Sequence, residues 1–102
     1  MKSCLIVIDV QESFRHRPYF DAAALSTYLA SQNALITAAL ADRVPVVRVL
    51  HADEPDTPDN PFSHASGLVR PLDGLVPFEA ALTVHKASHS ALVGTGLDVW
   101  LV

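Results

Sequence analysis

An α/β fold with a parallel sheet is predicted by three segments in the first half of the sequence. Residues 4–8 form an unbroken apolar run, residues 22–42 carry apolar side chains at helical spacing, and residues 46–50, Val-Val-Arg-Val-Leu, form a second segment rich in β-branched side chains. A strand, a helix and a strand in this order make a β-α-β unit, whose crossover is almost always right-handed. The chain has 102 residues, which is enough for one domain at most.

The first predicted strand, residues 4–8, is rich in β-branched side chains and is apolar on both faces. This pattern is typical of a strand in the middle of a parallel sheet, buried on both sides. The helix over residues 22–42 has Asp21 as its expected N-cap, and Pro45 requires it to end before Val44. Its buried face is predicted to contain Leu25, Tyr28, Leu29, Ile36, Ala39 and Leu40.

The second half of the sequence is less regular. Residues 52–81 contain five prolines and begin with an acidic stretch, and a loop of this length is either functional or a solvated surface excursion. Residues 82–85 are a candidate third strand, and residues 94–101 predict a helix start with Thr95 as its N-cap. Three strands and one complete helix give little cover to a strand that is apolar on both faces. We therefore expect residues 1–102 to be the N-terminal half of a single, larger α/β domain.

The composition argues against several classes of protein. Half of the residues are hydrophobic and 18% are charged, which argues against disorder. The formal net charge is −4 and there is no basic run, so nucleic acid is not an expected partner. The longest apolar run, residues 4–8, is too short to span a membrane or to form the core of a signal peptide. A single cysteine excludes an internal disulfide. We expect a cytoplasmic protein that does not bind membranes.

Two charged residues follow predicted strands. Asp9 lies at the carboxyl end of the first strand, and Lys86 lies just beyond the third. Ligands of parallel α/β sheets bind at this edge, so both side chains are candidates for a site there. Asp9 can serve as a general base, a metal ligand or a loop cap, and Lys86 can tune a reacting group or form a plain salt bridge.

These residues belong to a wider pattern. Leu5-Ile-Val-Ile-Asp9-Val-Gln11 is followed by Phe14, and His85-Lys86 is followed by Ser90-Ala-Leu and by Thr95-Gly-Leu-Asp-Val-Trp-Leu101. In this order, the motifs resemble those of the isochorismatase-like cysteine hydrolases, which are related to the nicotinamidases, over essentially the whole sequence. The resemblance implies a Rossmann-like three-layer fold with a parallel sheet of about six strands, of which this chain supplies about the first three.

The resemblance also implies an Asp-Lys-Cys catalytic triad. Asp9 matches the base that takes the thiol proton, and Lys86 matches the cation that stabilises the thiolate. The nucleophilic cysteine of the family lies beyond the next strand, so we expect it past residue 102. Cys4 does not replace that cysteine, because it precedes Asp9 by five residues on the same strand and points to the opposite face. We expect Cys4 to be a buried core thiol.

The implied activity is hydrolysis of a small-molecule substrate, an amide, a ureido compound or an enol ether, without a cofactor and in a homo-oligomer. The alternative is a catalytically inactive, truncated relative that serves as a structural or oligomeric module. A phosphate-binding α/β domain is a weaker alternative, since Val10 follows Asp9 and no glycine-rich loop follows the first strand.

Four further residues are candidates for substrate binding. The resemblance places Gln11 and Phe14 near the pocket, Phe14 as an apolar wall, although packing alone also accounts for this phenylalanine. His51 directly follows the second predicted strand and is expected to line the substrate or to form hydrogen bonds at the end of that strand. His89 faces either the substrate or a neighbouring subunit. Outside this set of four, Arg70 is open to the same two alternatives. The order His51-x-Asp53 reverses the Asp-x-His metal pattern of nicotinamidases, so we expect no metal.

Overall fold

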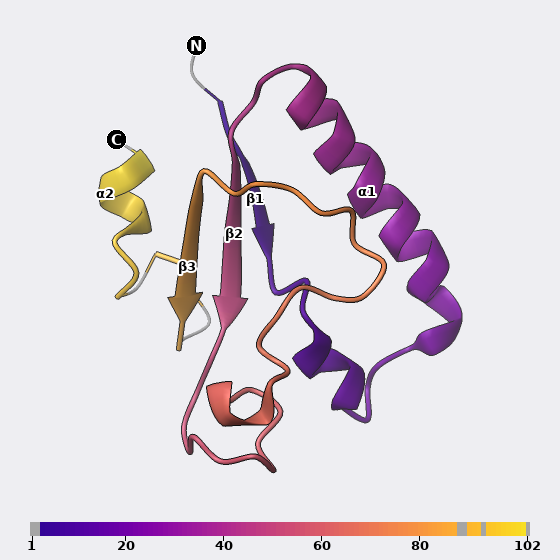
Figure 1. The fold of residues 1–102 in the computed structure, drawn as a ribbon, viewed down its shortest axis with the longest axis vertical. Coiled ribbons are helices and arrows are strands. Elements are labelled where there is room, and N and C mark those ends of the chain that lie inside the picture. The colour runs from indigo at the N-terminus through magenta and orange to yellow at the C-terminus, as the bar shows by residue number, and fades with distance from the viewer. Residues whose placement is uncertain (1–2, 88–89, 93, 102) are drawn as a thin grey trace.

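A computed structural model describes residues 3–87, 90–92 and 94–101. It contains a parallel three-stranded sheet in the order β1-β2-β3, built from β1 (Leu5–Ile8), β2 (Val46–His51) and β3 (Leu82–Lys86). All three strands run in the same direction, so their carboxyl ends lie at one edge of the sheet (Figure 1). The α/β fold with a parallel sheet, predicted from the sequence, is confirmed.

The predicted helix over residues 22–42 is also confirmed. A 3₁₀ turn, η2 (Ala22–Ala24), leads into α1 (Leu25–Ala41). The Asp21 carboxylate accepts a hydrogen bond from the backbone N–H of Ala23 at 3.0 Å, which makes Asp21 the cap of this turn. The helix ends at Ala41, with Asp42 as its C-cap, and so stops before Val44 as Pro45 requires.

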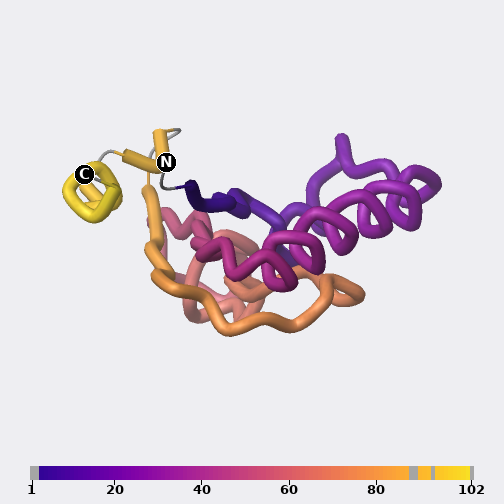
Figure 2. Tube along the Cα trace, turned by 90° about the horizontal axis from the view of Figure 1, so that it is seen from above, coloured from indigo at the N-terminus to yellow at the C-terminus, as the bar shows by residue number. Residues whose placement is uncertain are grey.

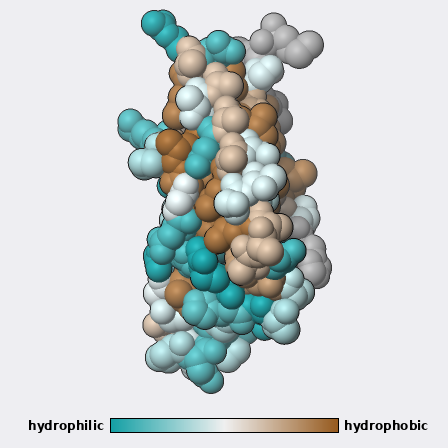
Figure 3. Space-filling model, turned by 90° about the vertical axis from the view of Figure 1, so that its right-hand side faces the viewer, coloured by the Kyte–Doolittle hydropathy of each residue, from teal (hydrophilic) through white to brown (hydrophobic). Residues whose placement is uncertain are grey.

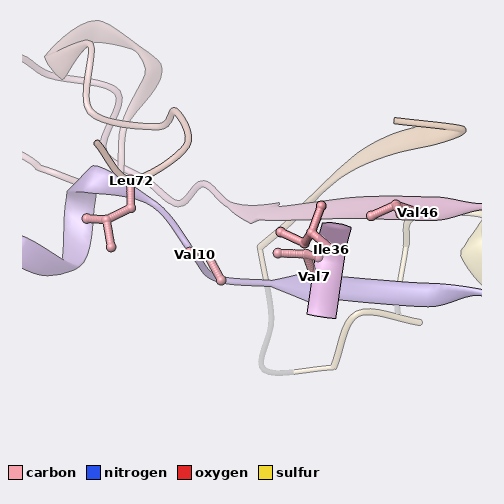
Figure 4. Packing of buried hydrophobic residues seen from close by; sticks show 5 residues of the cluster. All are labelled: Val7, Val10, Ile36, Val46 and Leu72. Atoms are coloured by element: carbon pink, nitrogen blue, oxygen red, sulfur yellow. The ribbon is translucent and has the colours of Figure 1, made fainter. Parts of the chain in front are cut away.

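Each face of the sheet is covered by a helix, which gives three layers. On one face, Ile36 of α1 packs against Val7 and Val46, and Leu72 of the long loop joins the same cluster together with Val10 (Figure 4). On the other face, Leu97 of α2 (Leu97–Leu101) packs against valines of β2 and β3. Figure 2 shows α1 and α2 on opposite sides of the sheet. The described residues therefore form the three-layer arrangement that the resemblance implies.

The centre of this sheet is β2 rather than β1. Four of the six residues of β2 are buried, because α1 and α2 cover it from both faces. Within the described chain β1 pairs with β2 alone, and Ile8 is 43% exposed. On α1, Tyr28 and Leu40 are each 42% exposed, whereas the spacing places them in the core. The apolar stripe of the helix is wider than the part of the sheet that lies beside it.

The long loop over residues 52–81 is packed against the segment that follows β1. Its residues 68–72 exchange backbone hydrogen bonds with residues 10–13, next to the 3₁₀ helix η1 (Glu12–His16). The Asn33 side chain of α1 donates to the carbonyl of Gly74 and accepts from the N–H of Val76. The loop also contains a short 3₁₀ helix, η3 (His64–Ser66). Much of this loop is therefore fixed on the body of the domain.

The surface differs between the two ends of the molecule. Seen from the side of α1, hydrophobic and hydrophilic residues are mixed along the upper part, and hydrophilic residues predominate at the lower end (Figure 3). That lower end holds the loops that follow the strands (Figure 1). None of the helices in the described ranges has the length and apolar character needed to cross a membrane.

Candidate active site

Asp9 directly follows β1 and has an unusual backbone conformation. Its φ is +62°, in the left-handed region that residues other than glycine rarely occupy, although aspartate tolerates it better than most. Two backbone hydrogen bonds hold this turn: the N–H of Asp9 donates to Val49, and the N–H of Gln11 donates to the carbonyl of Asp9, both at 3.0 Å. Strained backbone of this kind is concentrated at functional sites, where the surrounding structure maintains it.

Lys86 reaches Asp9 across the end of β2. It is the last residue of β3, and its Nζ lies 3.3 Å from Asp9 Oδ2. Since β2 separates the two strands, their backbones are about 10 Å apart, a distance that the long lysine side chain can bridge. The Lys86 side chain is 4% exposed and that of Asp9 is 33% exposed. A charge as deeply buried as this ammonium requires partners, and the Asp9 carboxylate is one of them.

The Asp9 carboxylate retains one unused oxygen. Oδ1 is buried and has no hydrogen-bond partner among the described residues. A buried acceptor left without a partner is costly, so the surrounding structure must maintain this arrangement. Asp9 and Lys86 line a pocket of about 270 Å³ together with Phe14, Arg17, Tyr19, His51, Asp53 and Phe62.

A second pocket adjoins Asp9 on the side of α1. Its volume is about 410 Å³, and it is lined mainly by apolar side chains such as Ile8, Phe20 and Leu25. Tyr28 also lines it, and burial, followed by the negative charge of Asp9, raises the pKa of the Tyr28 phenol. Asp9 therefore lines both pockets.

Gln11 links the turn after β1 to the end of β2. Its side chain is 1% exposed. The amide oxygen accepts from the N–H of His51 at 2.7 Å, and the amide nitrogen donates to the carbonyl of His51 and to Ser13 Oγ, each at 2.9 Å. Both N–H groups of the amide are thus used within the protein. Contact between Gln11 and substrate stays a prediction, and the observed bonds give Gln11 a positioning role.

His51 and Phe14 both line the pocket of about 270 Å³. His51 Nε2 is 3.3 Å from Asp53 Oδ2, and its Nδ1 is buried without a partner in the described part of the chain. Phe62 contacts both rings edge-on, with centroid distances of 4.8 Å to Phe14 and 5.5 Å to His51. The three rings form one aromatic wall. Whether Phe14 and His51 contact substrate stays a prediction.

Three members of the pocket, Arg17, Tyr19 and Phe62, were not expected from the sequence. Phe62 comes from the irregular loop, and Arg17 follows the short helix η1. None of these positions belongs to a periodic pattern or to a quoted motif. An apolar aromatic residue among the acidic and proline residues of the loop was the available signal for Phe62. Of the predicted residues, His89 lies outside the described ranges, and its role stays a prediction.

Other polar side chains lie away from this pocket. His64 and His85 pack edge-on with centroids 5.2 Å apart, and burial, together with His64, lowers the pKa of His85. Among the residues that the structure describes, no group of three or more histidine, cysteine, aspartate or glutamate side chains is arranged to hold a metal ion. Cys4 is half-buried and precedes β1, at the opposite end of that strand from Asp9.

Solved structures of known proteins share the fold of this chain. N-carbamoylsarcosine amidase from Thermoplasma acidophilum is 25% identical, with a TM-score of 0.76 over 99% of this chain and 61% of that one. A protein of Burkholderia xenovorans, provisionally described as an isochorismatase, is 29% identical, with a TM-score of 0.80 over 97% of this chain and 47% of that one. An isochorismatase from Pseudomonas putida is 24% identical, with a TM-score of 0.74 over 97% of this chain and 49% of that one.

The chain therefore spans about half to three-fifths of the length of these solved structures. No curated protein sequence matches it significantly. The family model of the isochorismatase domain matches residues 3–102, which is almost the whole sequence. The motifs, the three-layer fold and this match agree, and the chain belongs to the isochorismatase domain family.

Proposed function

We propose that this chain supplies the base and the cation of a hydrolase that acts on a small-molecule amide, ureido compound or enol ether. The contact between Asp9 and Lys86 carries the proposal. These residues lie on strands that are not neighbours, yet they meet at the edge where parallel sheets bind ligands. The likeness to an N-carbamoylsarcosine amidase supports hydrolysis of a C–N bond.

Asp9 acts as the general base in this proposal. Its carboxylate, on a side chain that is 33% exposed, accepts the proton of an attacking thiol, and the Lys86 ammonium stabilises the resulting thiolate and the negative charge on the substrate. A free cysteine, with a pKa of about 8.5, is only slightly ionised at neutral pH, so it requires such partners. For an amide or ureido substrate, the thiolate attacks the carbonyl carbon, the C–N bond breaks, and the nitrogen leaves with the proton that Asp9 took from the thiol. Water then hydrolyses the covalent intermediate, which releases the acid product and the free thiol. An enol-ether substrate does not require the covalent step.

The attacking thiol is assigned to a residue outside 1–102. Cys4 lies five residues before Asp9, which corresponds to about 16 Å along an extended strand. At that distance its thiol cannot deliver a proton to the Asp9 carboxylate. The proposal includes a homo-oligomer, which the resemblance to the cysteine hydrolases favours, and a cytoplasmic location.

Replacement of Asp9 by asparagine tests the proposal in the intact protein. Asn preserves the shape and tolerates the left-handed backbone, but it cannot take a proton. We expect hydrolysis of the best substrate, found by screening amides, ureido acids and enol ethers, to fall by about 10²–10⁴-fold. Asp42→Asn, at the exposed C-terminus of α1, is the matched control and should retain full activity.

Two outcomes would contradict the proposal. Full activity of the Asp9→Asn enzyme would remove Asp9 from the mechanism. Absence of turnover of all three substrate classes by the unmodified protein would favour the alternative, an inactive structural or oligomeric module.

A further inference from the structure

Arg17 places a guanidinium group in the pocket of Asp9 and Lys86. It follows η1, and two backbone hydrogen bonds fix this corner of the chain: the N–H of Arg17 donates to Phe14, and the carbonyl of Arg17 accepts from Phe20. The guanidinium carbon lies 4.7 Å from the centroid of the Phe62 ring. This is within the range of a cation–π contact, which favours one orientation of an otherwise flexible side chain.

The charges of this pocket divide into pairs, and Arg17 stands outside them. Lys86 pairs with Asp9, and the Asp53 carboxylate contacts His51 and accepts a hydrogen bond from Asn60. Within the ranges that the structure describes, Arg17 has no carboxylate at ion-pair distance. The pocket therefore presents a cation whose donors are open to a ligand.

The neighbouring arginines show that this arrangement differs from a solvated surface pair. Arg15 donates to Glu12 at 2.8 Å, and Arg70 donates to Asp73 at 2.9 Å. Neither Arg15 nor Arg70 lines the pocket of Asp9. Arg17 is exposed, as Arg15 and Arg70 are, but it lies against Phe62 and lines the pocket together with Asp9 and Lys86. Its planar set of donors matches the two oxygens of a carboxylate.

We propose that Arg17 binds a carboxylate of the substrate and selects small anionic molecules over neutral ones. This proposal rests on the proposed function, which places the reacting carbon of the substrate next to Asp9 and Lys86. A volume of about 270 Å³ is at the lower limit of small-molecule pockets, so the carboxylate and the reacting carbon belong to the same compact molecule. Phe62 acts as a positioning residue, since it orients the guanidinium.

The test compares two probes that cannot be hydrolysed, so binding is measured without turnover. One is levulinate, a ketone with a terminal carboxylate, and the other is the neutral ketone in which a hydroxymethyl group replaces that carboxylate. Their dissociation constants are measured by calorimetry on the intact protein and on Arg17→Gln and Arg17→Lys. Arg70→Gln is the matched control, because it removes a guanidinium that lies outside the pocket.

We expect the unmodified protein and Arg70→Gln to bind levulinate with a dissociation constant about tenfold lower than that of the neutral ketone. This ratio corresponds to one charge-assisted hydrogen-bonded contact. The preference should fall to about twofold or less in Arg17→Gln and lie between these values in Arg17→Lys, because lysine keeps the charge but lacks the planar fork. An unchanged preference in Arg17→Gln would overturn the proposal. Failure of the unmodified protein to bind levulinate at millimolar concentration would overturn it as well.

This experiment is independent of the one on Asp9. Loss of the levulinate preference in Arg17→Gln supports carboxylate binding even if no substrate is turned over. Conversely, a strong effect of Asp9→Asn on hydrolysis together with an unchanged preference would leave the proposed function intact and reject the role of Arg17.

Discussion

Removing Asp9 should destabilise the protein more than removing Lys86, although the two side chains form one contact. The Lys86 side chain is 4% exposed, whereas that of Asp9 is 33% exposed. When Asp9 is replaced by asparagine, a deeply buried ammonium loses the carboxylate beside it. When Lys86 is replaced by methionine, the remaining carboxylate still reaches water, so its charge stays partly solvated.

The exposures set the expected magnitudes. Breaking a fully buried ion pair by removing one partner costs about 3–5 kcal/mol, and the partial exposure of Asp9 reduces this to about 2–3 kcal/mol for Asp9→Asn. Asparagine is well accepted at a φ of +62°, so backbone strain adds little. For Lys86→Met, which keeps an unbranched apolar stem in the same space, we expect a loss of about 1 kcal/mol or less.

Urea unfolding followed by far-ultraviolet circular dichroism measures these free energies in the intact protein. The double variant should be about as stable as Lys86→Met alone, because the buried charge that made Asp9→Asn costly is then absent. The exposed pair of Arg70 and Asp73 provides a control cycle, for which we expect a coupling below about 1 kcal/mol. A larger loss for Lys86→Met than for Asp9→Asn, or additive losses in the double variant, would refute the reasoning.

Two further predictions concern the segment after β1. Gln11→Glu puts an oxygen where the amide donates to the His51 carbonyl, so we expect urea unfolding to show a loss of about 1–3 kcal/mol; an unchanged midpoint would contradict this. Burial opposes ionisation of Glu12, but hydrogen bonds from Arg15 and from the N–H of Asp73 outweigh it and hold the Glu12 pKa below its ordinary 4.5. Ionised Glu12 thus stabilises the fold above that value, and the stabilisation is lost as the pH falls through the lower folded pKa. The melting temperature should therefore fall less steeply with decreasing pH in Glu12→Gln than in the unmodified protein. Equal pH dependences of the two melting temperatures would count against this linkage.

The regular elements were predictable from the sequence because each buries a repeating pattern. The apolar residues of β1 and β2 and the spacing of Leu25, Leu29 and Ile36 correspond to surfaces that are buried in the structure or packed against the core. The position of β1 in the sheet was not predictable in the same way. An apolar strand shows that both faces require cover, but it carries no information about how many neighbours form hydrogen bonds with its edges.

The candidate site was predictable only in part, for a related reason. Asp9 and Lys86 follow strands, and parallel strands bring their carboxyl ends to one edge, so their proximity follows from the topology. Phe62 and Arg17 reach the same pocket through irregular backbone. Their positions depend on hydrogen bonds such as that from the N–H of Asp53 to the carbonyl of Phe62, and no periodicity in the sequence encodes such bonds.

The spacing of the motif after β1 has a structural explanation in the alternating directions of its side chains. Asp9 faces the pocket, and Val10 is buried in the core on the face of α1. Gln11 binds the backbone of His51, and Glu12 binds the N–H of Asp73 in the long loop. Phe14 returns to the pocket wall. Each residue of the motif therefore fixes the turn to a different neighbour, and these attachments together maintain the left-handed backbone that directs the Asp9 carboxylate at Lys86.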